Sequence, residues 1–283
     1  MKVIKPFVVI IIFVFLLASC QKRGIFHTNH SINHYEKIMD YFANIEDNSV
    51  NEIILQYILN QLKKSDAIIE EFPITIDKEN SNINIICRFY PQYSRRILLI
   101  TPYIPAGLDD TAYRRAETER IAFNVGLMLE TTSMLSSHIP DQFGVDLVFL
   151  GSEGNYNTIR SYNKAFHDLI ANYGKTKPEI GIYLMLHSSQ KLSIPIDDHS
   201  YQKLPYIVHR VWTTAEKLGW KEFETSLVAS SLFEGEELLY RDLNTIKLKN
   251  IYEEDKEVLP ENLIVNYRIL GSLFSELIYG KDK

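Results

Sequence analysis

The chain has 283 residues, of which 46% are hydrophobic and 23% are charged, and its formal net charge at pH 7 is −6. This length and composition are typical of a globular protein with one large domain or two small ones. A mildly acidic chain without basic clusters gives no reason to expect a nucleic-acid partner.

The first twenty residues have the pattern of a secretory signal. Lys2 and Lys5 are followed by an unbroken apolar run from Phe7 to Ala18. Positive charge before a short apolar run is typical of a signal peptide, and this run is shorter than the roughly 20 residues that a spanning helix needs. Leu17-Ala18-Ser19-Cys20 resembles a lipobox, which predicts that Cys20 is acylated and begins the mature protein. The alternative is an ordinary signal peptide that is cut elsewhere.

These signals predict three parts: a signal peptide at 1–19, a lipid-anchored tether at 20–34 and a single domain at 35–283. Two or more acyl chains hold a protein stably on a bilayer. We therefore expect a cell-envelope protein that is attached to a membrane and faces the periplasm or the outside. Lipidation of Cys20 would leave Cys87 as the remaining thiol, and the apolar run around Cys87 favours a buried structural thiol over a nucleophile.

Apolar spacing predicts helices that alternate with strands after residue 35. The expected helices are 35–44, 50–64, one within 111–135, 158–173, 201–218, 236–242 and 260–279. The expected strands are 67–76, 83–90, 96–103, 145–150, 180–187, 224–228 and 245–251. This order predicts a three-layer α/β/α sandwich with a mostly parallel mixed sheet, to which the first two strands add an antiparallel edge.

Four segments resemble the superfamily of zinc aminopeptidases and glutaminyl-peptide cyclotransferases, and the cyclase-like branch in particular. They are the strand Arg95–Ile100, the strand and loop Gly144–Glu153, the helix Ser200–Gly219 with its SYQ and VW motifs, and the PENL segment Pro260–Leu263. The resemblance covers most of the chain from residue 35 onward and implies a zinc-exopeptidase-like fold. In an intact member it also implies zinc held by carboxylate and imidazole groups, with one position open for water or substrate.

The residues at the family's zinc-ligand positions depart from that pattern. The H-Y-D motif corresponds to Pro102-Tyr103-Ile104, and the second acid of the following loop corresponds to Gly154. The Asp between them falls on Arg120 in an ungapped alignment, whereas an alignment with an insertion places Asp110 there. The later ligands fall on Met185 or Leu186, on Glu234-Gly235-Glu236, and on 250–255, which contains no histidine. Glu153, which matches the family's general acid/base, is retained. A general base without a metal-bound water has little to act on.

Three interpretations stay open. The first is a degenerate, non-catalytic member without a cofactor, which binds a peptide or an envelope protein where the active site would be, at the carboxyl ends of the strands. Its binding surface would be lined by Tyr103, Glu153, Asn155, Tyr156 and His187. The second is a divergent zinc-dependent glutaminyl cyclase or aminopeptidase that uses Asp110, Glu153, His187 and Glu236. The third is a structural subunit, which would expose an apolar patch away from the strand ends.

Several polar residues have a simpler interpretation than metal binding. Asp110 is expected to cap the helix that follows it, and Asp197-Asp198-His199 is expected to do the same for the next one. His27, His30 and His34 lie in or beside the expected tether, where solvated side chains are the simpler interpretation.

Overall fold

The structure is a computed structural model that describes residues 24–44, 49–77, 80–105, 111–151, 163–174, 177–188, 191–229, 236–251 and 259–280. The expected lipidation site Cys20 and the expected site residues Asp110, Glu153, Asn155 and Tyr156 lie outside these ranges.

A six-stranded sheet forms the centre of the domain, in the order β1-β2-β4-β3-β5-β8. Its strands are β1 (Ile68–Asp77), β2 (Asn80–Phe89), β3 (Arg96–Pro102), β4 (Gly144–Leu150), β5 (Ile180–Met185) and β8 (Thr245–Lys249). The last four run parallel, whereas β2 pairs antiparallel with both β1 and β4. The predicted antiparallel edge is therefore confirmed. Every residue of β3 and β4 is buried, as their continuous apolar runs predict.

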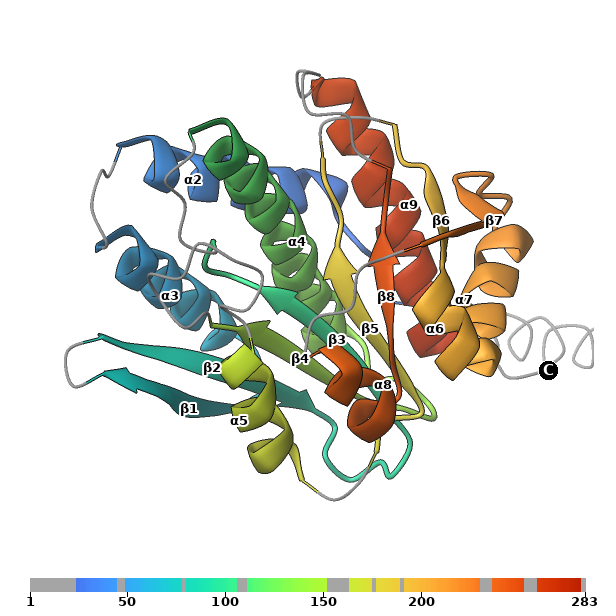
Figure 1. The fold of residues 1–283 in the computed structure, drawn as a ribbon, viewed down its shortest axis with the longest axis horizontal. Helices are drawn as coiled ribbons and strands as arrows, with labels where there is room; N and C mark the ends of the chain where they lie inside the picture. Colours follow the sequence, from blue (N-terminus) through green and yellow to red (C-terminus); the bar gives the residue numbers. More distant parts are fainter. Residues whose placement is uncertain are drawn as a thin grey trace, which may run out of the picture.

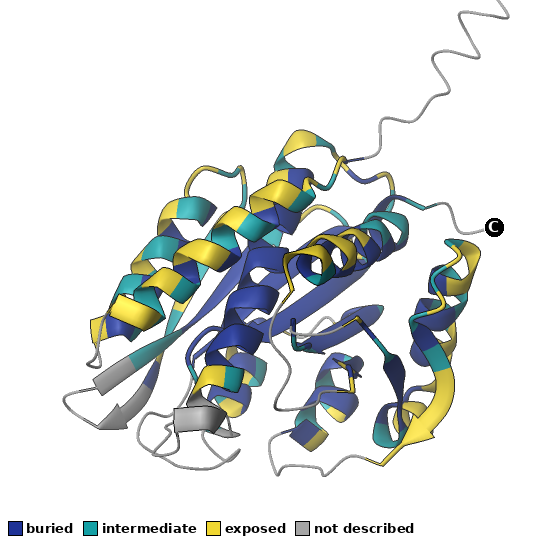
Figure 2. Ribbon diagram, turned by 90° about the horizontal axis from the view of Figure 1, so that it is seen from above, coloured by how far each residue is buried: buried dark blue, intermediate teal, exposed yellow. Residues whose placement is uncertain are grey.

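Helices cover both faces of this sheet (Figure 1). One face is covered by α2 (Thr28–Asn44), α3 (Ser49–Leu62), α4 (Thr111–Ser137) and α9 (Pro260–Tyr279), and the other by α5 (Asn163–Tyr173) and α8 (Glu236–Leu243). Alternate strand residues face the two helix layers: Leu99 packs in the first cluster and Leu98 in the second. Figure 2 shows the sheet buried between the layers, with the exposed residues on the outer sides of the helices. The predicted three-layer sandwich is confirmed.

A second, two-stranded parallel sheet pairs β6 (Ile194–Asp197) with β7 (Phe223–Val228). The predicted helix at 201–218 is instead two helices, α6 (Asp198–Lys203) and α7 (Pro205–Lys217). Pro205 has no N–H to continue the first helix but suits the first turn of a new one. The carboxylate of Asp197 accepts a hydrogen bond from Ser200 N at 2.7 Å, so the predicted helix cap is confirmed.

The amino-terminal segment belongs to the domain from Gly24 onward. Helix α2 starts at Thr28 rather than at 35, and Ser275 Oγ donates a hydrogen bond to Gly24 O at 3.4 Å. A Cβ on Gly24 would lie 2.6 Å from Met134 Cγ and 2.8 Å from the Tyr279 hydroxyl oxygen. The part of the expected tether between 24 and 34 is thus packed against α4 and α9. No helix within the described ranges is both long and apolar enough to cross a membrane.

Candidate functional site at the carboxyl ends of the strands

The parallel strands β3, β4, β5 and β8 end at the same edge of the sheet, where α/β proteins usually bind their ligands. We call this region the mouth and define it by the residues that follow β3, β5 and β8 together with the first turns of α4 and α9 that are described. The amino-terminal half of α4 crosses it, because Asn124 Nδ2 donates to Leu186 O at 2.9 Å directly after β5.

The end of β3 supplies no metal-binding group to the mouth. Pro102 and Ile104 are buried and apolar. Tyr103 has no exposed surface, and its hydroxyl donates a hydrogen bond to Ile83 O at 2.8 Å. Burial raises the pKa of the Tyr103 hydroxyl above its usual value. The side chain was expected to line a binding surface, but it is packed inside the domain, because its hydroxyl is directed toward the backbone of β2.

A buried ion pair occupies the mouth instead. Arg120 Nε donates to Glu117 Oε1 at 2.8 Å and Arg120 Nη2 donates to Glu117 Oε2 at 2.5 Å. Arg120 is 1% exposed and Glu117 is 7% exposed. Burial alone would raise the pKa of Glu117, but the charge and hydrogen bonds of Arg120 outweigh it and lower that pKa. The third guanidinium nitrogen, Nη1, lies 3.1 Å from the Met185 sulfur.

This contact joins two positions that the resemblance assigns to zinc ligands. In the ungapped alignment Arg120, the tenth residue of α4, matches the family's Asp, for which Asp110 is the alternative. Met185 is one of the two residues that match the family's Asp at the strand end. In this chain a guanidinium lies against a thioether at these positions. The carboxylate that accompanies them, Glu117, is already bound on both oxygens by Arg120.

His187 lies beside this ion pair, in the loop after β5. The backbone N–H of His187 donates to Asn250 Oδ1 at 2.8 Å, and Asn250 Nδ2 donates back to the backbone oxygen of His187 at 3.0 Å. These two bonds join the loops after β5 and β8. Burial, and then the positive charge of Arg120, lower the pKa of the His187 imidazole to about 3. The imidazole is therefore neutral at neutral pH.

Glu236, the fourth residue of the enzyme interpretation, is part of a different ion pair. Lys247 Nζ lies 2.7 Å from Glu236 Oε2, and both side chains are buried. A buried carboxylate that is already neutralised by lysine is a poor ligand unless the pair separates. Among the described residues, no group of three or more His, Cys, Asp or Glu side chains is arranged to hold a metal ion. The described part of the mouth thus does not fit zinc.

Solved structures show what this architecture is similar to. A glutaminyl cyclase from Tannerella forsythia aligns with a TM-score of 0.70 and 18% identity over 91% of this chain and 99% of its own. A glutaminyl cyclase from Bacteroides thetaiotaomicron bound to N-acetylhistamine aligns with a TM-score of 0.74 and 16% identity, over 92% of this chain and 100% of its own. A Zn-dependent exopeptidase from Parabacteroides distasonis aligns with a TM-score of 0.71 and 17% identity, over 90% of this chain and 99% of its own. The chain has the fold of the glutaminyl cyclases and zinc-dependent exopeptidases. No protein-family model and no curated protein sequence matches it.

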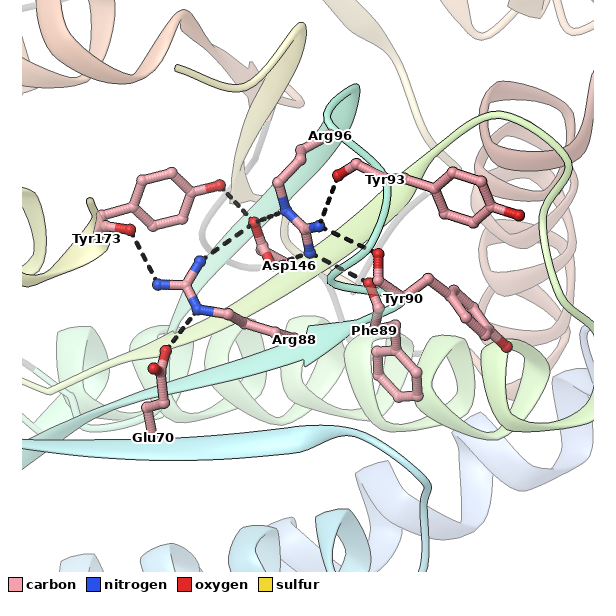
Figure 3. Close-up of polar contacts among 8 residues, drawn as sticks. All are labelled: Glu70, Arg88, Phe89, Tyr90, Tyr93, Arg96, Asp146 and Tyr173. Atoms are coloured by element: carbon pink, nitrogen blue, oxygen red, sulfur yellow. Dashed lines mark hydrogen bonds and ion pairs between the residues drawn. The ribbon is translucent and has the colours of Figure 1, made fainter. Parts of the chain in front are cut away.

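Within this cyclase-like fold, a second buried charge network lies at the opposite end of the strands (Figure 3). Asp146 accepts hydrogen bonds from Arg96 Nε at 2.6 Å and from the Tyr173 hydroxyl at 2.6 Å, and lies 3.6 Å from Arg88 Nη1. Arg96 also donates to three backbone carbonyls, those of Phe89, Tyr90 and Tyr93. We call Arg88, Arg96, Asp146 and Tyr173 the base network, because they lie at the base of the sheet, opposite the mouth. The aspartate of the family-like "VDLVF" strand is thus a structural residue in this chain.

The segment that carries the amino-terminal histidines is packed on the domain, but the side chains of His27 and His30 are exposed, as expected, and that of His34 is partly buried. His27 N donates to Glu130 Oε1 at 2.8 Å, and His30 Nδ1 lies 3.3 Å from Glu130 Oε2. His34 Nδ1 is 2.6 Å from the Tyr57 hydroxyl, and burial lowers the pKa of His34 to about 4. Glu130 lies in the middle of a long helical sequence, and nothing in that pattern indicated its role in positioning α2.

The thiol of Cys87 is fully buried, and burial raises its pKa to about 12. A thiol with this pKa has almost no thiolate at neutral pH, and the thiolate is the nucleophilic form. The prediction of a buried structural thiol is confirmed.

Proposed function

We propose that this protein is a membrane-anchored lipoprotein whose cyclase-like domain is non-catalytic and binds a peptide or an envelope protein at the mouth. The observation that carries the proposal is the buried Arg120–Glu117 ion pair, whose arginine lies where the ungapped resemblance places a zinc-binding aspartate. The lipid anchor rests on the lipobox-like sequence that ends at Cys20.

Electrostatics favour the loss of zinc chemistry at these positions. A dication next to a buried guanidinium would meet a repulsion that the protein interior screens weakly. Removing Glu117 from Arg120 to ligate zinc would leave a buried arginine without its counter-charge, which costs about 3–5 kcal/mol. The neutral His187 alone is a weak substitute for a ligand set.

The surroundings of the mouth favour a binding role. Ile251 follows Asn250, which is bonded to His187, and it is 48% exposed. Ile264 and Val265 are each 38% exposed and precede Asn266, whose Nδ2 lies 3.5 Å from Ser188 O. Exposed apolar side chains therefore lie on both sides of the turn after β5. Exposed apolar side chains are a common feature of interaction sites, and these three belong to segments that adjoin the strand ends.

The test for zinc uses the mature, detergent-solubilised protein. Its zinc content after dialysis against micromolar zinc, and its cyclisation of peptides with an N-terminal glutamine, are measured for the wild type, Glu153→Gln and His187→Ala. We expect no tightly bound zinc and no cyclisation in any of the three. One zinc per chain, lost in His187→Ala, together with cyclisation that is lost in Glu153→Gln, would establish the divergent enzyme.

The test for binding places a photo-crosslinking amino acid at Ile251 in living cells, with Leu227 on β7 as the matched exposed control. We expect a discrete crosslinked peptide or protein from position 251 that is missing from position 227. Equal or absent crosslinking at both positions would contradict a binding mouth.

A further inference from the structure

The first described residues lie at the end of the domain that is opposite the mouth. Gly24 lies against Met134 and Tyr279, which belong to the last turns of α4 and α9. Both helices contact the mouth before they reach these last turns, because Asn124 in the middle of α4 bonds to Leu186 O and Asn266 near the start of α9 lies at Ser188 O. They run in the same direction along the sheet (Figure 1). The chain therefore enters the domain at the far ends of both helices.

The distance between the entry point and the anchor is short. Three residues lie between Cys20 and Gly24, and the four Cα–Cα steps that join them reach at most about 14 Å in an extended chain. Along α4, Met134 at the entry point lies ten residues after Asn124 at the mouth, which is about 15 Å of helix. An acylated Cys20 would therefore hold the domain with the ends of α4 and α9 toward the bilayer and the mouth away from it.

Two exposed isoleucines lie at this entry end. Ile25 follows Gly24 and is 63% exposed, and Ile139 is 66% exposed. Ile139 follows His138, whose carbonyl oxygen accepts a hydrogen bond from the Tyr279 hydroxyl at 2.8 Å, and that hydroxyl also lies against Gly24. Both isoleucines thus flank one contact point, the Tyr279 hydroxyl.

The sequence beyond this end of the domain carries a basic excess on both sides. Lys22 and Arg23 precede Gly24 in the chain, and Lys281-Asp282-Lys283 follows Gly280 after α9. Basic side chains that lie beside an inserted apolar group strengthen its binding to anionic lipids.

From these placements we infer that the end of the domain formed by Ile25, Ile139 and the last turns of α4 and α9 is a membrane-contact surface. The inference rests on the lipid anchor of the proposed function and names the bilayer itself as the partner of this surface. Ile25 and Ile139 enter the headgroup region, and the mouth opens toward the aqueous side. The ligand of the mouth therefore reaches it from solution and not from the bilayer to which this chain is anchored.

The test measures depth in the bilayer by spin labelling of the full lipidated protein. Cysteine replaces Ile25 or Ile139 at the entry end, and Ile251 or Ile264 at the mouth as matched exposed controls. Cys87 is fully buried and Cys20 is acylated, so the nitroxide reagent labels the introduced thiol. The protein is reconstituted in vesicles of phosphatidylethanolamine and phosphatidylglycerol, and collisions of the label with oxygen and with a water-soluble nickel chelate are compared.

The reference is the same labelled protein after proteolysis has released it from its anchor into solution without detergent. Relative to this reference, we expect the labels at 25 and 139 on the anchored protein to collide more with oxygen and less with the nickel chelate. The labels at 251 and 264 are expected to show no such change. Two labelled positions at each end keep the test decisive if one variant fails to fold, as judged by near-ultraviolet circular dichroism.

Two kinds of failure are distinguishable. If mass spectrometry of the mature amino-terminal peptide shows no acyl group on Cys20, the anchor fails and the inference fails with it. If Cys20 is acylated but positions 25 and 139 behave like 251 and 264, the anchor stands and the membrane-contact surface is overturned. Bilayer contact at 251 and 264 would overturn the inferred orientation.

Discussion

The base network and the mouth both contain a buried arginine that is paired with a buried carboxylate, but the two arginines have different surroundings. At the base, Arg96 is bonded to Asp146 and to three backbone carbonyls, and Tyr173 and Arg88 complete the site (Figure 3). At the mouth, the Arg120 side chain bonds to Glu117 and lies against the Met185 sulfur. The same pair of residue types thus supports backbone geometry at one end and lies at a position matched to a zinc ligand at the other.

The largest expected effect is at the base. Asp146→Asn leaves Arg96 and the partly buried Arg88 without their shared counter-charge, so we expect a loss of about 3–5 kcal/mol in the free energy of unfolding. Urea unfolding of the purified domain measures it. The control is Glu216→Ala, an exposed acid on α7, which should stay within about 0.5 kcal/mol of wild type. A loss below about 1 kcal/mol in Asp146→Asn would contradict the structural role.

A pair of double variants separates the two ends. Arg120→Met alone should cost about 3 kcal/mol, and adding Glu117→Gln should recover most of that loss, because no buried charge remains. Adding Arg96→Met to Asp146→Asn should recover little, because three backbone carbonyls would lose their donor. Equal recovery at both ends would contradict the comparison. Arg268→Met, at an exposed position of α9, serves as the control for the arginine replacement.

A smaller effect is expected from the bridge between the two loops of the mouth. Asn250→Ala removes both hydrogen bonds to the His187 backbone, so we expect a loss of about 1–3 kcal/mol. Thermal unfolding and hydrogen exchange at residues 186–188 measure it. Asn172→Ala, which removes an exposed side-chain hydrogen bond to Asp168 O, is the matched control. An equal loss of stability in the two variants would show that the bridge between the loops stabilises the fold no more than an exposed hydrogen bond does.

The smallest effect concerns pH. His34 has a pKa of about 4 in the folded chain, against 6.5 for the unfolded one. Between these values the unfolded chain binds a proton that the folded chain does not, so stability falls as the pH falls from 6.5 toward 4. At pH 5.5 we expect His34 to account for at most about 1 kcal/mol of this loss, because the side chain is only partly buried. Measured by urea unfolding, the free energy of unfolding of His34→Gln should depend less steeply on pH than that of the wild type. His209→Gln, at an exposed position of α7, is the control.

Much of the fold could be predicted from the sequence, because local patterns report it. The apolar runs of β3 and β4 indicated strands buried on both faces, and the segments around the first turn indicated an antiparallel pair. The start of α2 and the packing of Gly24 could not be predicted in this way. They depend on Met134, Glu130 and Tyr279, which are more than a hundred residues away in the chain.

The site was less predictable than the fold. The ungapped resemblance matched Arg120 to a zinc-ligand position of the family, but its pairing with Glu117 was not predicted. An acid three residues before an arginine on a helix is a local signal for such a pair. The burial of Tyr103 was missed, because the direction of a side chain beyond a strand end depends on tertiary packing. The same holds for the Lys247 partner of Glu236.

The most direct test of the central claim is a crystal structure of the mature domain grown with zinc, with anomalous data collected at the zinc absorption edge. We expect Arg120 to remain bonded to Glu117, and we expect no anomalous peak within ligand distance of His187 or Glu153. A zinc ion bound to His187, with Arg120 moved away from Met185, would contradict the central claim.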